Sequence, residues 1–174
     1  IEQNRKQYDF EPTDLLALAR QTVKLMEPYA AERAVSLQLE TSNIQHSTPN
    51  VELNADGRAL QQALINLIDN AIKHSPKDSV VRVGLEFKSN AFQLWVADEG
   101  KGIPLAEHAK IFERFYRHGS ELRRETPGVG IGLSIVKHIV EAHGGNVLVE
   151  SEPGQGSRFT IELPVKNQAT DEHR

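Results

Sequence analysis

Residues 56–74 read DGRALQQALINLIDNAIKH, and this stretch decides how the rest of the chain is interpreted. Asp56 is a residue type that commonly caps a helix, and the apolar residues after it recur at helical spacing. The apolar face holds Leu60, Leu64, Leu67, Ile68, Ala71 and Ile72. Asn66, Asn70 and Lys73 lie on the opposite face at i, i+4 and i+7. The pattern predicts a helix to about His74, with one face in a core and a polar stripe on the other.

Strand-like runs lie on both sides of this helix. Val35, Leu37 and Leu39 alternate with polar residues, which indicates a half-buried strand. Further strands are predicted at 51–55, 80–87, 91–97, 146–150 and 158–163. Residues 88–90 predict a hairpin turn, and 153–156 (Pro-Gly-Gln-Gly) predict a second turn.

Other helices are expected before and after these strands. Thr13 or Asp14 can cap a helix that Pro28 should kink or end. Residues 131–143 have helical spacing with a glycine stop, and a shorter helical piece is expected around 105–115. Because these elements do not alternate as regular βαβ units, we expect an α/β (α+β) two-layer sandwich. Its mixed, mostly antiparallel sheet should have helices on one face.

Composition limits the possible functions. The chain has 174 residues, a formal net charge of -4 and no cysteine. It therefore lacks a broad cationic field that would attract nucleic acid or anionic lipid, and it has no thiol chemistry. No apolar run is long enough to span a bilayer. We expect no nucleic-acid partner and no membrane insertion of this piece.

The chain divides into three expected segments. Residues 1–8 are polar and predict a linker or the end of a preceding helix, 9–165 the domain, and 166–174 a disordered tail. The first residue is Ile1 rather than methionine, so we expect a piece of something longer.

The polar stripe of residues 56–74 has the groups that a metal–nucleotide needs. Asparagine oxygens suit a hard cation, and a lysine ammonium suits a phosphate. The alternative is an ordinary solvated helix face.

Residues 98–104, Asp-Glu-Gly-Lys-Gly-Ile-Pro, directly follow a predicted strand. Asp98 could accept a hydrogen bond from an exocyclic amine such as that of adenine, and the glycines would let a planar ring approach the backbone. The alternative is an ordinary turn after a strand.

Residues 128–134, Gly-Val-Gly-Ile-Gly-Leu-Ser, open the helix at 131–143. Free backbone N–H groups at a helix N-terminus favour phosphates. The spacing is neither a dinucleotide fingerprint nor a P-loop, and a flexible hinge is the alternative. Between the two glycine clusters, Phe112 to Arg117 could anchor a lid whose arginines close over phosphates. Alternatively, these aromatics belong to the core and the arginines to the surface.

Four segments in this order resemble the catalytic domain of sensor histidine kinases, in the superfamily that also includes gyrase, Hsp90 and MutL. They are the segment from Asn66 to His74 and those around Asp98, Phe112 and Gly128. The likeness extends from about Phe10 to Pro164 and implies a Bergerat-type fold that holds ATP and Mg²⁺ between the asparagine helix and the lid.

The resemblance also implies a role for each residue of the site. Asn70 would be the protein ligand to magnesium, Asn66 and Lys73 would support metal and phosphates, and Asp98 would bind the adenine amino group. The remaining implied nucleotide contacts are His74, Gly100, Gly102, Ile103, Phe115, Arg117, Gly128, Val129, Gly130, Ile131, Gly132 and Leu133.

Asn66 occupies the position where ATP-hydrolysing relatives have a glutamate that activates water. An amide is not a useful general base, so phosphoryl transfer to a protein is favoured over hydrolysis. None of the seven histidines has the sequence neighbourhood of the family's phosphoacceptor. We therefore expect this piece to bind ATP without phosphorylating itself.

The resemblance implies partners as well. The phosphoacceptor would lie on a helical hairpin of the same parent, which would be a homodimer in the bacterial inner membrane, and a response-regulator receiver domain would take the phosphoryl group. A serine kinase of the anti-sigma-factor type and an ATP-responsive module without catalysis are the alternatives.

Overall fold

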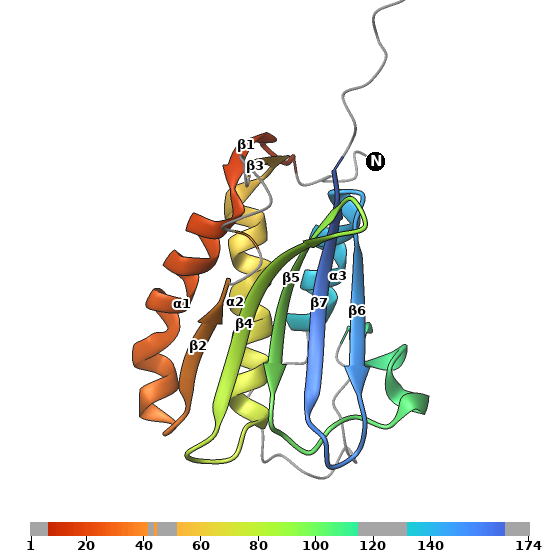
Figure 1. Ribbon diagram of the computed structural model, residues 1–174. Coiled ribbons are helices and arrows are strands. Elements are labelled where there is room, and N and C mark those ends of the chain that lie inside the picture. Colours follow the sequence, from red (N-terminus) through yellow and green to blue (C-terminus); the bar gives the residue numbers. More distant parts are fainter. Residues whose placement is uncertain (1–6, 42–43, 45–51, 115–131, 166–174) are drawn as a thin grey trace, which may run out of the picture.

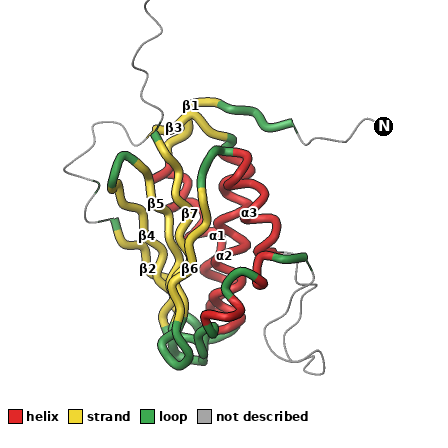
Figure 2. The backbone as a smooth tube through the Cα atoms, turned by 90° about the vertical axis from the view of Figure 1, so that its right-hand side faces the viewer, coloured by secondary structure: helices red, strands yellow, loops and turns green. Residues whose placement is uncertain are grey.

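The computed structural model describes residues 7–41, 44, 52–114 and 132–165. These residues form two layers, a mixed five-stranded sheet and a layer of helices that covers one of its faces (Figures 1 and 2). The expected two-layer sandwich with helices on one face is confirmed.

The strand order of the sheet is β2-β4-β5-β7-β6. β2 (Ser36–Glu40) is parallel to β4 (Val80–Lys88). Every other pair of adjacent strands in this sheet is antiparallel. The remaining strands, in their order across the sheet, are β5 (Ala91–Asp98), β7 (Ser157–Pro164) and β6 (Asn146–Ser151). Ser89 and Asn90 have φ of 54° and 58°, the left-handed conformation typical of a tight hairpin turn.

The helical layer consists of α1 (Leu15–Glu32), α2 (Gly57–His74) and α3 (Gly132–Ala142) among the described residues. The apolar face of α2 is buried as the sequence predicts, and Asp56 caps its start by accepting the Ala59 N–H at 3.0 Å. α3 ends before Gly144, whose φ is 71°, so the predicted glycine stop is confirmed.

Three local predictions differ from the structure. Pro28 does not end α1, which continues to Glu32; the proline lies on the exposed side, where water can satisfy the carbonyl left without a partner. The predicted helical piece at 105–115 is two short 3₁₀ segments, η1 (Leu105–Glu107) and η2 (Lys110–Phe112), in its described part. β1 (Glu11–Asp14) was not predicted; it pairs antiparallel with β3 (Glu52–Ala55) in a small second sheet.

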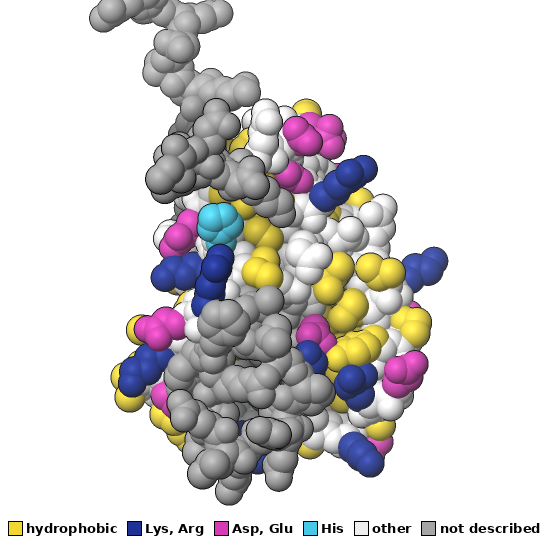
Figure 3. Space-filling model, turned by 180° about the vertical axis from the view of Figure 1, so that it is seen from behind, with side chains coloured by type: hydrophobic (Ala, Val, Ile, Leu, Met, Phe, Trp, Pro, Cys, Tyr) yellow, Lys and Arg dark blue, Asp and Glu magenta, His cyan; other side chains and the backbone are white. Residues whose placement is uncertain are grey.

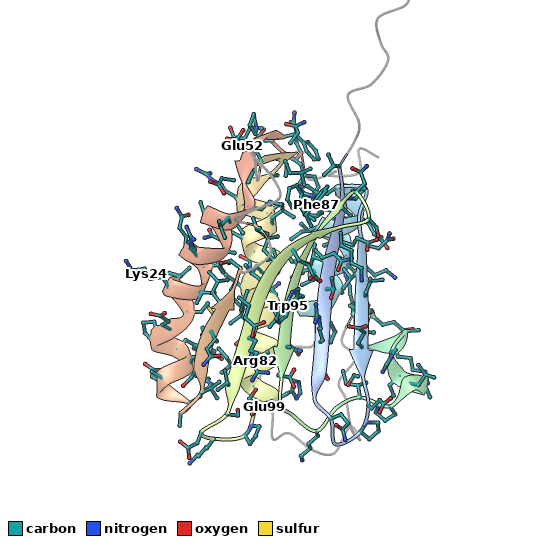
Figure 4. The ribbon with its side chains drawn as sticks, in the orientation of Figure 1. Lys24, Glu52, Arg82, Phe87, Trp95 and Glu99 are labelled. Atoms are coloured by element: carbon teal, nitrogen blue, oxygen red, sulfur yellow. The ribbon has the colours of Figure 1, made fainter. Side chains whose placement is uncertain are left out.

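The face of the sheet opposite the helices carries the Trp95 side chain (Figure 4). Its ring lies over Gly84 of the neighbouring strand, where a Cβ atom would be 2.1 Å from ring carbons. The Arg158 guanidinium lies 4.1 Å from the ring centroid and 3.4 Å from a Glu86 oxygen. The ring is only 8% exposed, because the missing side chain at Gly84 leaves space for it.

The cap of α2 makes a pH-dependent contribution to stability. Hydrogen bonding from the Ala59 N–H lowers the pKa of Asp56 below its ordinary value of 3.8. The stabilisation is therefore present above the unfolded pKa and is lost as pH falls through the folded pKa. We expect Asp56→Ala to reduce the free energy of unfolding by about 1 kcal/mol at pH 7. Urea titrations should show this difference shrinking below pH 4; a pH-independent difference would contradict the role of the charge.

Candidate functional site

The polar stripe of α2 lies on the side of the helix away from the core. Asn66, Asn70 and Lys73 are all half-buried. The Asn66 Oδ1 accepts a hydrogen bond from Gln62 Nε2 at 2.9 Å, and its Nδ2 donates to the Gly132 carbonyl at 3.4 Å. The Asn70 amide makes no hydrogen bond to any residue that the structure describes. It therefore has an oxygen available for a ligand.

The start of α3 lies beside Asn66. A Cβ atom on Gly132, the first residue of α3, would be 4.0 Å from Asn66 Cβ. The N–H groups of a helix N-terminus and its positive dipole end are therefore next to the amide stripe, an arrangement suited to an anion. Leu133, the next residue, packs against the core.

Six of the predicted contacts lie outside the described residues. They are Phe115, Arg117, Gly128, Val129, Gly130 and Ile131. The neighbouring Phe112 is described, and its ring makes an edge contact with Phe159 at 6.2 Å between centroids.

Asp98 ends β5 and is 9% exposed. Its Oδ1 accepts the Gly100 N–H at 2.8 Å. Burial raises the pKa of this carboxyl, although hydrogen bonds from the backbone of Gly100 and Ser157 act in the opposite direction. A buried carboxylate with fixed orientation is a selective acceptor for a ligand amine.

Gly100 connects the Asp98 segment to the C-terminal end of α2. A Cβ atom at Gly100 would lie 2.5 Å from the His74 carbonyl oxygen and 2.9 Å from Asp98 Oδ1. No side chain fits there without a shift of the backbone. The fold thus brings Asp98, Gly100 and the backbone of His74 together, and the His74 side chain is exposed at the same place.

Gly102 and Ile103 contact the turn between β6 and β7. Gly102 has φ of 75°, and a Cβ atom there would be 1.9 Å from the Glu152 carbonyl oxygen. Ile103 is half-buried against the core, and its N–H donates to Ser151 Oγ at 2.7 Å. In this structure, both residues hold the shape of the segment after Asp98. The first residue of this segment, Glu99, is labelled in Figure 4.

Lys73 is held by an ion pair that was not predicted. Its Nζ lies 2.9 Å from an Asp69 oxygen one helical turn earlier. The pKa of Tyr29, on α1, is raised to about 12 by burial first and then by the hydrogen bond and charge of Asp69. The i, i+4 spacing of Asp69 and Lys73 could have indicated the ion pair, whereas the contact with Tyr29 depends on helix packing.

The donor groups fit a cation that arrives with a phosphate ligand. Among the described residues, no group of three or more His, Cys, Asp or Glu side chains could hold a metal ion. Mg²⁺ in nucleotide sites commonly uses one or two protein oxygens together with phosphate oxygens and waters. The available Asn70 oxygen meets this requirement, so the residues present fit the ion.

A separate hollow of about 490 Å³ opens along α3. It is lined by Tyr8, Gln62 and Arg114, with Ser134, Lys137 and His138 among its α3 residues. It does not include Asn70, Lys73 or Asp98, so its chemistry differs from that of the stripe. On the helix-covered face, acidic and basic side chains are interspersed rather than forming a broad area of one sign (Figure 3).

One family matches most of the chain. The pattern described as "Histidine kinase-, DNA gyrase B-, and HSP90-like ATPase" matches residues 55–167. The circadian input-output histidine kinase CikA of Synechococcus elongatus is 36% identical over 166 residues, which are 94% of this chain and 21% of the relative. The alginate biosynthesis sensor protein KinB of Pseudomonas aeruginosa is 35% identical over 152 residues, 87% of this chain and 24% of the relative. The chain thus spans about a fifth to a quarter of these relatives.

Solved structures share the fold. Full-length ShkA in complex with AMPPNP superposes with a TM-score of 0.78 at 31% identity, over 94% of this chain and 33% of that one. The catalytic domain of the histidine kinase ThkA, in a nucleotide-free form, has a TM-score of 0.74 at 27% identity, over 90% of this chain and 95% of that one. The similarity therefore extends over at least nine-tenths of this chain.

Proposed function

Since the chain belongs to the histidine kinase-, DNA gyrase B-, and HSP90-like ATPase family, we propose that it supplies the phosphoryl-transfer activity of a sensor histidine kinase. It is an ATP-binding catalytic domain of that kind. The observation that carries the proposal is the position of the polar stripe. Asn66, at one end, lies beside the start of α3, and the backbone of His74, at the other end, meets the Asp98 segment.

The adenine end of the site is formed by Asp98. Its carboxylate accepts a hydrogen bond from the exocyclic amino group of the base. Gly100 keeps a side chain out of the space beside the carboxylate, and Gly102 lets the segment after Asp98 pass close to the Glu152 carbonyl. His74 and Ile103 line the base and ribose region. We assign the domain to residues 9–165, with 1–8 as the linker and 166–174 as the tail.

The phosphate end is formed by the stripe and the start of α3. Asn70 provides an amide oxygen to Mg²⁺, and Asn66 and Lys73 hold the phosphates together with the backbone of the glycine run at 128–132. When bound, the magnesium ion neutralises phosphate charge. The chain's own residues orient the γ-phosphoryl group and keep it in line with the incoming nucleophile.

Asn66 favours transfer over hydrolysis. Its Oδ1 already accepts a hydrogen bond from Gln62, and an amide does not take a proton from water at neutral pH. A neutral imidazole needs no activation by a base to attack phosphorus through its lone pair, so a histidine is a suitable acceptor for this site. Water, in contrast, would need the base that the site lacks at this position.

The acceptor histidine and the later steps lie outside this chain. We assign the acceptor to a helical hairpin of the parent protein, which is a homodimer, and the next acceptor to the aspartate of a response-regulator receiver domain. We place this domain on the cytoplasmic side of a parent anchored in the bacterial inner membrane. Among the described residues of this chain, no helix is long and apolar enough to cross a bilayer.

Mixing the domain with radiolabelled ATP, Mg²⁺ and the helical hairpin of its parent tests the proposal. We expect label on the hairpin, and we expect this phosphate to be lost in acid and kept in alkali, as a phosphoramidate is. Label that survives acid would instead indicate a serine kinase. ATP binding with no transfer in the intact parent would indicate a nucleotide-responsive module.

A further inference from the structure

The segment that carries Asp98 depends on another part of the chain for its shape. We call residues 98–103 the Asp98 loop and residues 152–156 the β6–β7 turn. The Gly154 N–H donates to the Lys101 carbonyl at 2.7 Å. A Cβ atom on Gly102 would be 1.9 Å from the Glu152 carbonyl oxygen, and one on Gly156 would be 2.1 Å from the Asp98 carbonyl oxygen. The two segments are thus interlocked at three points through their backbones.

Ser151, the last residue of β6, adds a side-chain connection between them. Its hydroxyl accepts the Ile103 N–H at 2.7 Å and donates to the Gly156 carbonyl at 2.8 Å. The Ser157 hydroxyl oxygen lies 2.8 Å from the Ser151 hydroxyl oxygen. A serine hydroxyl has one proton and two lone pairs. Since the Ser151 proton goes to Gly156, Ser157 must be the donor of the third bond, and every hydrogen-bonding capacity of Ser151 is used.

These bonds reach the Asp98 loop from both ends. Ile103 ends the loop, so its bond to Ser151 fixes the far end. Ser157 is directly opposite Asp98 in the β5–β7 pair and opposite Ser151 in the β6–β7 pair. Its side chain is 8% exposed, so its bond to Ser151 is shielded from water. Displacement of the Ser151 hydroxyl would therefore disturb both ends of the loop.

We propose that Ser151 is a positioning residue for the purine base, because its hydroxyl holds the Asp98 loop in the shape that aims the buried carboxylate. This inference rests on the proposed function, in which Asp98 accepts the adenine amino group. Ser151 acts through Ile103, Gly156 and Ser157. Loss of its hydroxyl leaves an N–H and a carbonyl without their partner, and the loop must move or admit water to satisfy them.

The test compares Ser151→Ala, Ser151→Thr and Ser151→Cys with Ser79→Ala. Ser79 is a matched control, because its hydroxyl also donates to a backbone carbonyl, that of Pro76 at 2.6 Å, and its side chain is buried whereas that of Ser151 is half-buried. Calorimetry at a temperature where each variant is folded gives the dissociation constants for ATP and GTP. Thermal melts give the loss of stability.

We expect Ser151→Ala to weaken ATP binding about tenfold, which corresponds to roughly 1.4 kcal/mol. Its preference for ATP over GTP should also fall, because a loosened carboxylate discriminates less well between purines. Threonine keeps the hydroxyl and should restore most of the affinity. Cysteine keeps the size but is a weak hydrogen-bonding group, so its affinity should be intermediate. Ser79→Ala should bind ATP as the wild type does.

Wild-type ATP affinity and base preference in Ser151→Ala, with only a lower melting temperature, would overturn the positioning role. If Ser151→Ala does not fold, Ser151→Cys decides, and equal ATP affinity of Ser151→Cys and wild type would overturn the role in the same way. Absence of ATP binding by the wild-type domain would instead overturn the proposed function.

Discussion

Asp98→Asn should remove nearly all adenine-nucleotide binding, with a rise in the ATP dissociation constant of about a hundredfold or more. The wild-type carboxylate is buried at 9% exposure and is an acceptor at both oxygens. The amide of asparagine has one donor group, which would face the donor hydrogens of the adenine amino group or the backbone N–H groups that now hold the carboxylate. Calorimetric titration with ATP measures the effect.

The adjacent acidic residue supplies the control for this substitution. Glu99 is exposed, so Glu99→Gln makes the same chemical change one residue later without altering a buried acceptor. It should bind ATP within about twofold of wild type, since exposed charges contribute little. Wild-type affinity in Asp98→Asn would show that the base is bound elsewhere.

Asn70→Asp should reduce phosphoryl transfer to the parent hairpin about a hundredfold, while ATP binding falls much less. The substitution replaces a neutral oxygen donor with an anion next to the triphosphate. An aspartate can still hold Mg²⁺, but it adds repulsion toward the γ-phosphoryl group and alters the position of the ion. The adenine end, centred on Asp98, is unchanged. Initial rates of hairpin labelling at saturating ATP measure transfer, and calorimetry measures binding.

Asn54→Asp provides the same charge change away from the stripe. Asn54 is exposed on β3 and should support wild-type rates when substituted. If Asn70→Asp transfers phosphate at the wild-type rate, Asn70 does not support the metal. If both variants lose ATP binding equally, the added charge acts through the whole domain and not through the site.

Much of the fold could be predicted because local signals agree with tertiary packing. Asp56 and the apolar residues after it predict α2, and in the structure these apolar residues are the ones that α2 buries. β1 was missed because its four residues, Glu-Pro-Thr-Asp, have no apolar alternation; their strand conformation results from pairing with β3. Of the two effects predicted for Pro28, a kink or an end of the helix, the end is wrong. The cost of a proline depends on whether the carbonyl one turn earlier can reach water, which a local sequence does not reveal.

The site could be predicted only in part for a similar reason. Asn66, Asn70 and Lys73 are related by helix periodicity, so one stretch of sequence places them together. The contact between Gly100 and the His74 carbonyl joins residues that are far apart in the chain, and only packing shows it. Ser151 is one serine at the end of a strand, without a periodic pattern. Its three hydrogen bonds depend on how β6, β7 and the Asp98 loop meet.

The shielded position of Trp95 has a spectroscopic consequence. It is the single tryptophan of the chain, and its indole lies over Gly84 under the Arg158 guanidinium, on the face of the sheet that the helices leave uncovered. Intrinsic fluorescence excited at the indole band therefore comes from this one site. Its emission should shift to the red when the sheet unfolds and water reaches the ring. A ligand held on the helical side lies across the sheet from the fluorophore, so this signal separates unfolding of the domain from occupancy of its site.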